Sequence, residues 1–109
     1  MIVGHSPDAD DAFMFYALTC AKIDTGKYVF RHALHDIETL NRKAVSGEFP
    51  ITDVSVASLP DIVDRYFVTH AGGSFGEGYG PVVISRSPMS VGDMVGKKVA
   101  VPGRKTSAF

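Results

Sequence analysis

Short apolar runs alternate along the chain with segments whose apolar residues recur every three to four positions. The runs are typical of buried strands, and the spaced pattern is typical of helices. Strands are predicted at residues 2–4, 28–32, 51–56, 67–70, 81–85 and 98–101. Helices are predicted at residues 12–21, 37–46, 57–66 and 90–95, and the start of another at 105–109. Strands that alternate with helices indicate an α/β fold with a mostly parallel sheet.

Residues with strong preferences for helix ends support two of these helices. Asp36 precedes residues 37–46 and Gly47 follows them, which are the positions of a cap and a stop. Aspartates also precede residues 12–21, where carboxylates accept first-turn N–H groups and oppose the helix dipole. This first helix is apolar from Phe13 to Leu18 and has almost no polar face. We therefore expect it to be covered on several sides.

Composition and charge narrow the class of protein. The chain has 109 residues, of which 45% are hydrophobic, and a net charge of −1. These values are ordinary for one folded domain and argue against a partner that is nucleic acid. No apolar run approaches the ~20 residues of a membrane span, so no membrane association is expected. Residues 1–7 do not resemble a secretory signal, and the lone Cys20 cannot form an internal disulfide. We therefore expect a cytoplasmic protein. Cys20 lies late in an apolar helix, so we expect its side chain to pack against other residues.

Small polar groups gather in three predicted turns between a strand and a helix. These turns are residues 6–11, 55–58 and 103–107. In open α/β sheets, ligands bind beyond the carboxyl ends of the strands, so the three turns predict a small-molecule site. Asp11 is a candidate for facing a cleft, and Ser55 could supply a donor. Thr106 and Ser107 follow a Gly turn at a predicted helix start, which favours an anion or carboxylate. Helix caps and local serine turns are the structural alternatives.

The remaining motifs give weaker indications of a functional site. His32 and His35 are three residues apart but have no third ligand nearby, so we expect no metal site. His5 and His70 are expected to have structural roles. The glycines of residues 76–80 precede a predicted strand rather than a helix, which argues against a dinucleotide loop. No catalytic triad can be assembled, so the residues alone indicate an α/β small-molecule binder without naming a reaction.

Four blocks of sequence, in order, resemble the menaquinone-biosynthesis family of the futalosine pathway. The blocks are residues 4–18, 36–41, 78–86 and 101–108. They span nearly the whole chain in one register, which makes the combination specific. One turn departs from the family, because Ser6–Asp11 reads Ser-Pro-Asp-Ala-Asp-Asp where the family usually has Ser-Pro-Cys-Pro-Asn-Asp. The aspartate at position 10 adds a negative charge, which bears on ligand preference.

The resemblance implies a fold like that of periplasmic binding proteins, in which two α/β lobes close over a ligand. It implies a lyase that splits cyclic dehypoxanthine futalosine into 1,4-dihydroxy-6-naphthoate and a second fragment, with a small-molecule carboxylate as substrate. No metal or organic cofactor is expected in this family. Carried over by position, the resemblance places substrate-binding residues in the cleft: Asp11, Ser55, Thr106, Ser107 and, through its backbone N–H, Ala108.

Members of that family are much longer than this chain. Residues 1–109 are therefore expected to form the N-terminal lobe, with the second lobe missing from the chain and no activity in this portion alone. The family's catalytic base, a histidine of the second lobe, has no counterpart here, so the catalytic residue is unassigned. A chorismate dehydratase of the same pathway and a non-catalytic solute-binding protein are the alternatives, and homodimerisation is left open.

Overall fold

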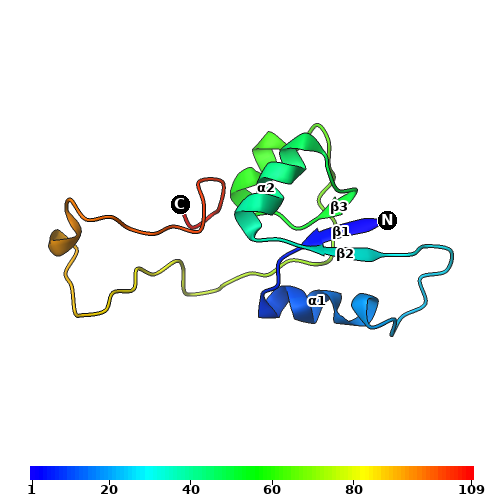
Figure 1. Ribbon diagram of the computed structural model, residues 1–109, viewed down its shortest axis with the longest axis horizontal. Coiled ribbons are helices and arrows are strands. Elements are labelled where there is room, and N and C mark those ends of the chain that lie inside the picture. The colour runs from blue at the N-terminus through cyan, green and yellow to red at the C-terminus, as the bar shows by residue number, and fades with distance from the viewer.

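The computed structural model describes residues 1–109 as a small α/β structure built on a three-stranded parallel sheet. The strands are β1 (Ile2–His5), β2 (Arg31–Leu34) and β3 (Ile51–Thr52), in the order β2-β1-β3. The central position of β1 sets the register, because Val3 pairs with both His32 and Ile51. Figure 1 shows helices α1 (Ala9–Thr19) and α2 (Ile37–Ser46) on opposite faces of this sheet. The predicted α/β class with a parallel sheet is confirmed.

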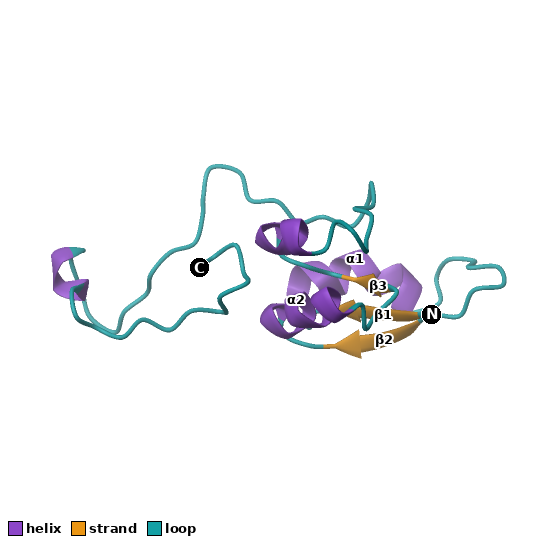
Figure 2. Cartoon of the chain, turned by 90° about the horizontal axis from the view of Figure 1, so that it is seen from above, coloured by secondary structure: helices purple, strands orange, loops and turns teal.

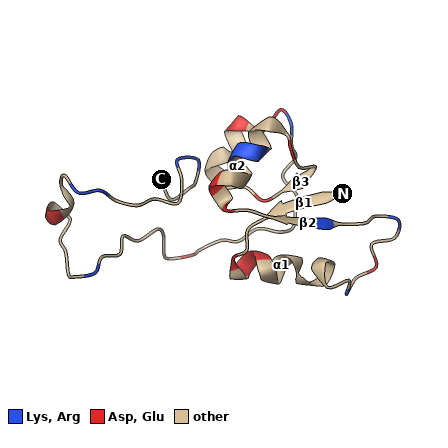
Figure 3. Ribbon diagram, in the orientation of Figure 1, with Lys and Arg blue, Asp and Glu red and all other residues tan.

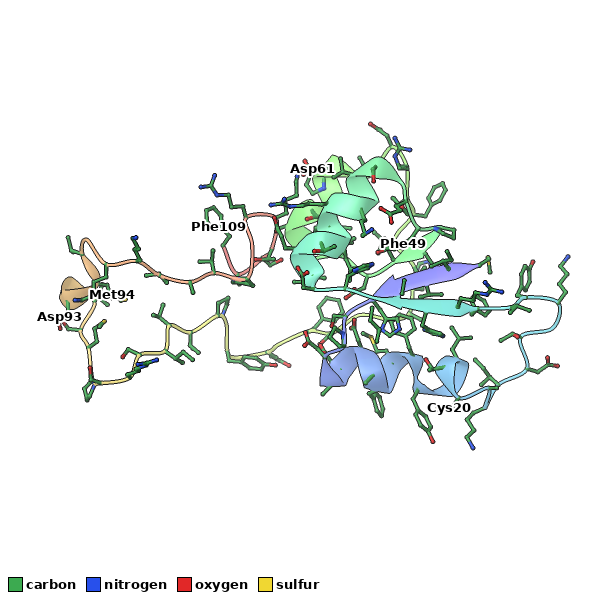
Figure 4. All side chains as sticks on the ribbon, viewed as in Figure 1. Cys20, Phe49, Asp61, Asp93, Met94 and Phe109 are labelled. Atoms are coloured by element: carbon green, nitrogen blue, oxygen red, sulfur yellow. The ribbon has the colours of Figure 1, made fainter.

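Helix α2 forms where its end residues predict it. Asp36 Oδ1 accepts the backbone N–H of Thr39 at 3.0 Å, and Gly47 ends the helix in the left-handed region with φ of 72°. Leu40 and Ala44 are fully buried on the face toward β1. They form the small apolar core together with three other side chains: Val3, Phe49 and Ile62. Phe49 lies beside the strands in Figure 4. The core therefore lies on the α2 side of the sheet.

Helix α1 begins earlier than predicted and is less covered. It starts at Ala9 instead of residue 12, so Asp11 lies within its first turn. Asp8 takes the cap position, but its side chain makes no capping hydrogen bond. Phe13 is 85% exposed, so the predicted cover on several sides is wrong for the outer face of this helix. Helix α1 contacts the sheet through a narrower stripe that includes Phe15, which stacks on His5. None of the helices is both long and apolar enough to cross a membrane.

Several predicted elements are shorter or shifted. The strand predicted at 28–32 forms at Arg31–Leu34, and the strand predicted at 51–56 is limited to Ile51–Thr52. Residues 57–66 form no α-helix; a 3₁₀ helix, η1, covers Val56–Asp61 instead. Pro60 inside this segment lacks an N–H and its ring opposes an α-helical turn. Residues 105–109 form hydrogen-bonded turns rather than the start of a helix.

Residues 76–102, the arm, extend away from the sheet and return (Figures 1 and 2). The arm contains one short 3₁₀ helix, η2 (Gly92–Met94), within the helix predicted at 90–95; Figure 4 labels Asp93 and Met94 at its tip. The prediction of strands is wrong for residues 67–70, 81–85 and 98–101, because none of these segments pairs with a neighbour. A strand needs a partner for its backbone groups, and here the apolar Ile84 is 88% exposed. The radius of gyration is 16.8 Å, against about 13 Å for a compact domain of this length.

Candidate functional site

A cavity of about 500 Å³ opens beside the carboxyl ends of the strands. Helix α1 lines it on one side, and the segment from β3 through η1 lines it on the other. Its polar lining includes the side chains of Asp10, Asp11, Thr52, Asp53, Ser55 and Ser107. Three of the five predicted substrate-binding residues, Asp11, Ser55 and Ser107, thus border one cavity. Asp11 and Ser55 meet there because β1 and β3 end at one edge of the sheet, whereas Ser107 comes from a turn that follows no strand.

Two carboxyl groups, those of Asp11 and Asp53, border this cavity and interact with each other. Asp11 is 3% exposed, and its Oδ2 accepts the backbone N–H of Ser6 at 2.6 Å. Asp53 follows β3 directly, and its backbone N–H donates to the Gly4 carbonyl at 2.8 Å. Burial, the charge of Asp11 and a hydrogen bond with the Asp11 side chain raise the pKa of Asp53 to about 6. Below about pH 6, Asp53 therefore holds a proton that it can donate to a hydrogen bond.

The first turn of α1 adds a further negative charge at the rim. Asp10 lines the same cavity, and Figure 3 shows acidic residues gathered at this end of α1. Hydrogen bonds from the Ser74 side chain and from backbone N–H groups lower the pKa of Asp10. Because its pKa is lowered, Asp10 carries a negative charge at neutral pH. One side of the cavity is therefore acidic.

The opposite side of the cavity presents two serine hydroxyls. Ser55 Oγ accepts a hydrogen bond from Asn41 Nδ2 at 3.1 Å. Ser107 Oγ accepts the backbone N–H of Ala57 at 3.2 Å. Each hydroxyl is held through its oxygen lone pair, which leaves its own proton available for an acceptor in the cavity. This side can therefore bind a carboxylate or carbonyl oxygen by donating to it.

The turn that carries Ser107 is held against α2 through its main chain. The Lys105 N–H donates to Glu38 Oε2 at 2.8 Å, and the Lys105 carbonyl accepts from Ser58 Oγ at 2.7 Å. Gly103 passes so close to α2 that a Cβ there would lie 2.5 Å from the Cβ of Glu38. The close approach requires glycine at this position. The turn is therefore docked on α2 although it forms no helix.

Thr106 and Ala108 lie outside the cavity lining. Thr106 is 6% exposed, and its hydroxyl donates to the Gly103 carbonyl at 2.8 Å within the turn. Ala108 is exposed. Contact between either residue and a ligand stays a prediction from the resemblance.

Comparison with known proteins identifies the family. A sequence profile described as menaquinone biosynthesis matches residues 1–109 of the chain. The chain belongs to the menaquinone biosynthesis family. Among family members, the chain is 40% identical over 107 residues to a 1,4-dihydroxy-6-naphtoate synthase of Thermus thermophilus. It is 33% identical over 107 residues to a protein of the same name from Streptomyces coelicolor.

The chain covers only part of each relative. Each alignment with the two synthases includes 98% of this chain, but 38% of the Thermus protein and 37% of the Streptomyces protein. An X-ray crystal structure of a protein from Archaeoglobus fulgidus matches with a TM-score of 0.75 and 49% identity. That match covers 83% of this chain and 34% of the other. The chain therefore spans a little over a third of the length of these relatives.

Two of the four histidines of this family member form a pair away from this cavity. His5 Nε2 and His32 Nδ1 are 2.9 Å apart and share one hydrogen bond. They border a second cavity of about 260 Å³, between β1, β2 and α1. Burial and the neighbouring His5 lower the pKa of His32. His35 stacks on Phe49, and no three potential metal ligands converge anywhere in the chain. Cys20, expected to pack, is exposed at the end of α1 (Figure 4).

Two polar residues of the site were not predicted from the sequence. Asn41 is 0% exposed and lies on the face of α2 that also buries Leu40 and Ala44. A polar residue among the apolar positions of a helix face is the pattern that could have identified it. Asp53 follows a buried strand directly, so its place at the carboxyl end of β3 could have been read in the same way as that of Ser55.

Proposed function

We propose that the full-length protein is a lyase of menaquinone biosynthesis that converts cyclic dehypoxanthine futalosine to 1,4-dihydroxy-6-naphthoate. The observation that carries the proposal is the match of 98% of the chain to two proteins named 1,4-dihydroxy-6-naphtoate synthase. The cavity supports it, because its two sides suit the two kinds of polar group on such a molecule. A dihydroxynaphthoate carries a carboxylate, which needs donors, and hydroxyls, which need acceptors.

In the proposed complex, the substrate carboxylate lies against Ser55 and Ser107. Their hydroxyls are oriented by bonds to Asn41 and to the Ala57 N–H, so they are ready to donate. The hydroxyl groups of the ring system lie toward Asp11 and Asp53, whose oxygens accept hydrogen bonds. The opposite orientation would place a carboxylate beside the acidic side of the cavity and is disfavoured by like-charge repulsion.

The proposed reaction needs a base to remove a proton next to a carbonyl, and donors to stabilise the oxyanion that develops. The serine hydroxyls are suited to hold the substrate. The resemblance places the base on a histidine in the second lobe, beyond these 109 residues. We therefore assign substrate binding, and no catalytic base, to the residues of this chain. The substrate-binding set is Asp11, Ser55, Thr106, Ser107 and Ala108.

We also propose that residues 1–109 belong to the first lobe of a two-lobed protein with the architecture of periplasmic binding proteins. The chain spans 37–38% of the two named synthases, which leaves room for a second lobe in proteins of their length. The apolar segments at 81–85 and 98–101 find no partner among these residues, which agrees with pairing elsewhere in a longer chain. In the full-length protein, backbone amides of both segments should be protected in hydrogen exchange. Rapid exchange at both would contradict this architecture.

The enzymatic proposal is tested with the purified full-length gene product. Incubation with cyclic dehypoxanthine futalosine should yield 1,4-dihydroxy-6-naphthoate, identified by mass spectrometry under anaerobic conditions. Ser107→Ala and Thr106→Val should each weaken substrate binding, whereas Ser46→Ala, at the far end of α2, serves as the matched control. Conversion of chorismate, with no reaction of the futalosine derivative, would assign the protein to dehydration instead. An unchanged affinity in Thr106→Val would remove Thr106 from the site.

A further inference from the structure

One buried amide side chain connects the two segments that carry the serine hydroxyls. Asn41 Oδ1 accepts the backbone N–H of Ser55 at 2.8 Å. Its Nδ2 donates to Ser55 Oγ at 3.1 Å and to the Lys105 carbonyl at 3.0 Å. The Asn41 side chain is therefore bonded to two segments that lie 14 and 64 residues away along the chain. Ser58 Oγ and Ser107 Oγ also join the two segments directly, and Asn41 is the side chain outside them that bonds to both.

The chemistry of the three bonds is specific to asparagine. The Ser55 N–H requires an acceptor, and the Lys105 carbonyl requires a donor, so the site needs one of each on a short planar group. Asn41 is 0% exposed, and a buried amide that loses its partners carries a large desolvation cost. Aspartate would keep the acceptor but lose both donations. Leucine would keep the approximate volume but lose all three bonds.

We propose that Asn41 is a positioning residue that holds Ser55 and the turn at residues 103–107 at a fixed separation, so that the hydroxyls of Ser55 and Ser107 bind one ligand carboxylate together. This inference rests on the proposed function. Asn41 is absent from the cavity lining, so it acts through the residues that it holds. Ser58 and Glu38 also bond to the turn, and the Ser58 N–H donates to the Ser55 carbonyl at 2.8 Å, but neither residue bonds to the Ser55 hydroxyl.

The test is a double-mutant cycle in the full-length protein, with 1,4-dihydroxy-6-naphthoate as the binding probe. Titration is carried out anaerobically and well below the melting temperature of each variant. Asn41→Asp should raise the Kd of the probe about tenfold. Ser107→Ala should also raise it, and Asn41→Asp should raise the Kd by a smaller factor in the Ser107→Ala background than in the wild type. Once the hydroxyl is absent, its position no longer matters, and Ser107 itself makes no bond to Asn41.

Two further measurements keep the outcomes distinct. Amide hydrogen exchange at residues 103–107 should accelerate in Asn41→Asp without any ligand, and should be unchanged in the control Ser46→Ala. Additive effects in the cycle, or an unchanged Kd in Asn41→Asp, would overturn the positioning role while leaving the proposed function in place. A wild-type protein that does not bind the probe would contradict the proposed function itself. In that case, unchanged exchange at 103–107 in Asn41→Asp would overturn the link between the two segments as well.

Discussion

The raised pKa of Asp53 beside Asp11 makes a quantitative prediction about stability and pH. Ionisation of Asp53 in the folded protein brings a second charge beside the Asp11 carboxyl in a partly buried place. Asp53→Asn removes this charge and keeps an N–H that can donate to Asp11. We expect the variant to be more stable than the wild type at alkaline pH, which is unusual for the loss of a polar group at a buried site.

The magnitude follows from the shift of the pKa of Asp53 from 3.8 to about 6. A difference of this size corresponds to about 3 kcal/mol lost when the group ionises in the folded state. Asp53 is partly exposed, so solvent screening reduces the expected gain to about 1 to 2 kcal/mol. The sign is fixed by linkage. The folded state holds the proton more tightly, so the contribution of Asp53 is most favourable below the unfolded pKa of 3.8 and declines as the pH rises through about 6.

Urea unfolding of the full-length protein at two pH values checks this reasoning. Asp53→Asn should raise the free energy of unfolding by about 1 to 2 kcal/mol near pH 8 and by clearly less near pH 4.5. Asp64→Asn is the matched control, because Asp64 is exposed and lies outside the cavity lining. If Asp53→Asn is destabilised near pH 8, or changes equally at both pH values, the raised pKa of Asp53 beside Asp11 is refuted.

Three other predictions follow from the packing. Leu40→Ala, at a fully buried position, should lower the free energy of unfolding by about 2 to 5 kcal/mol in urea titrations. Gly103→Ala should lower it by about 1 to 3 kcal/mol, because the added Cβ meets Glu38; an unchanged value would show that the turn is not docked as described. His32 should titrate below its ordinary pKa of 6.5 in NMR spectra, so its contribution to stability is lost as the pH falls below that value; a midpoint at or above it would contradict the packing against His5.

Local chemistry accounts for the elements that were predicted well. Asp36 and Gly47 determine the ends of α2 through bonds within a few residues, and both ends agree with the structure. The apolar run at residues 2–4 forms β1, and its place at the centre of the sheet comes from its pairing with β2 and β3. The polar residues Asp11 and Ser55, which follow β1 and β3, also border one cavity, as the rule for parallel sheets predicts.

Long-range contacts account for what the amino-acid pattern did not reveal. Segments 81–85 and 98–101 have strand-like composition, but no strand forms without a neighbour, and residues 1–109 provide none. The contact between Asp11 and Asp53 and the link from Asn41 to Lys105 join distant parts of the chain. Residue types alone do not encode such distances. The amino-acid order thus determines α2, the central strand and the kinds of group near the cavity, whereas packing decides which of those groups lie beside one another and which are held together.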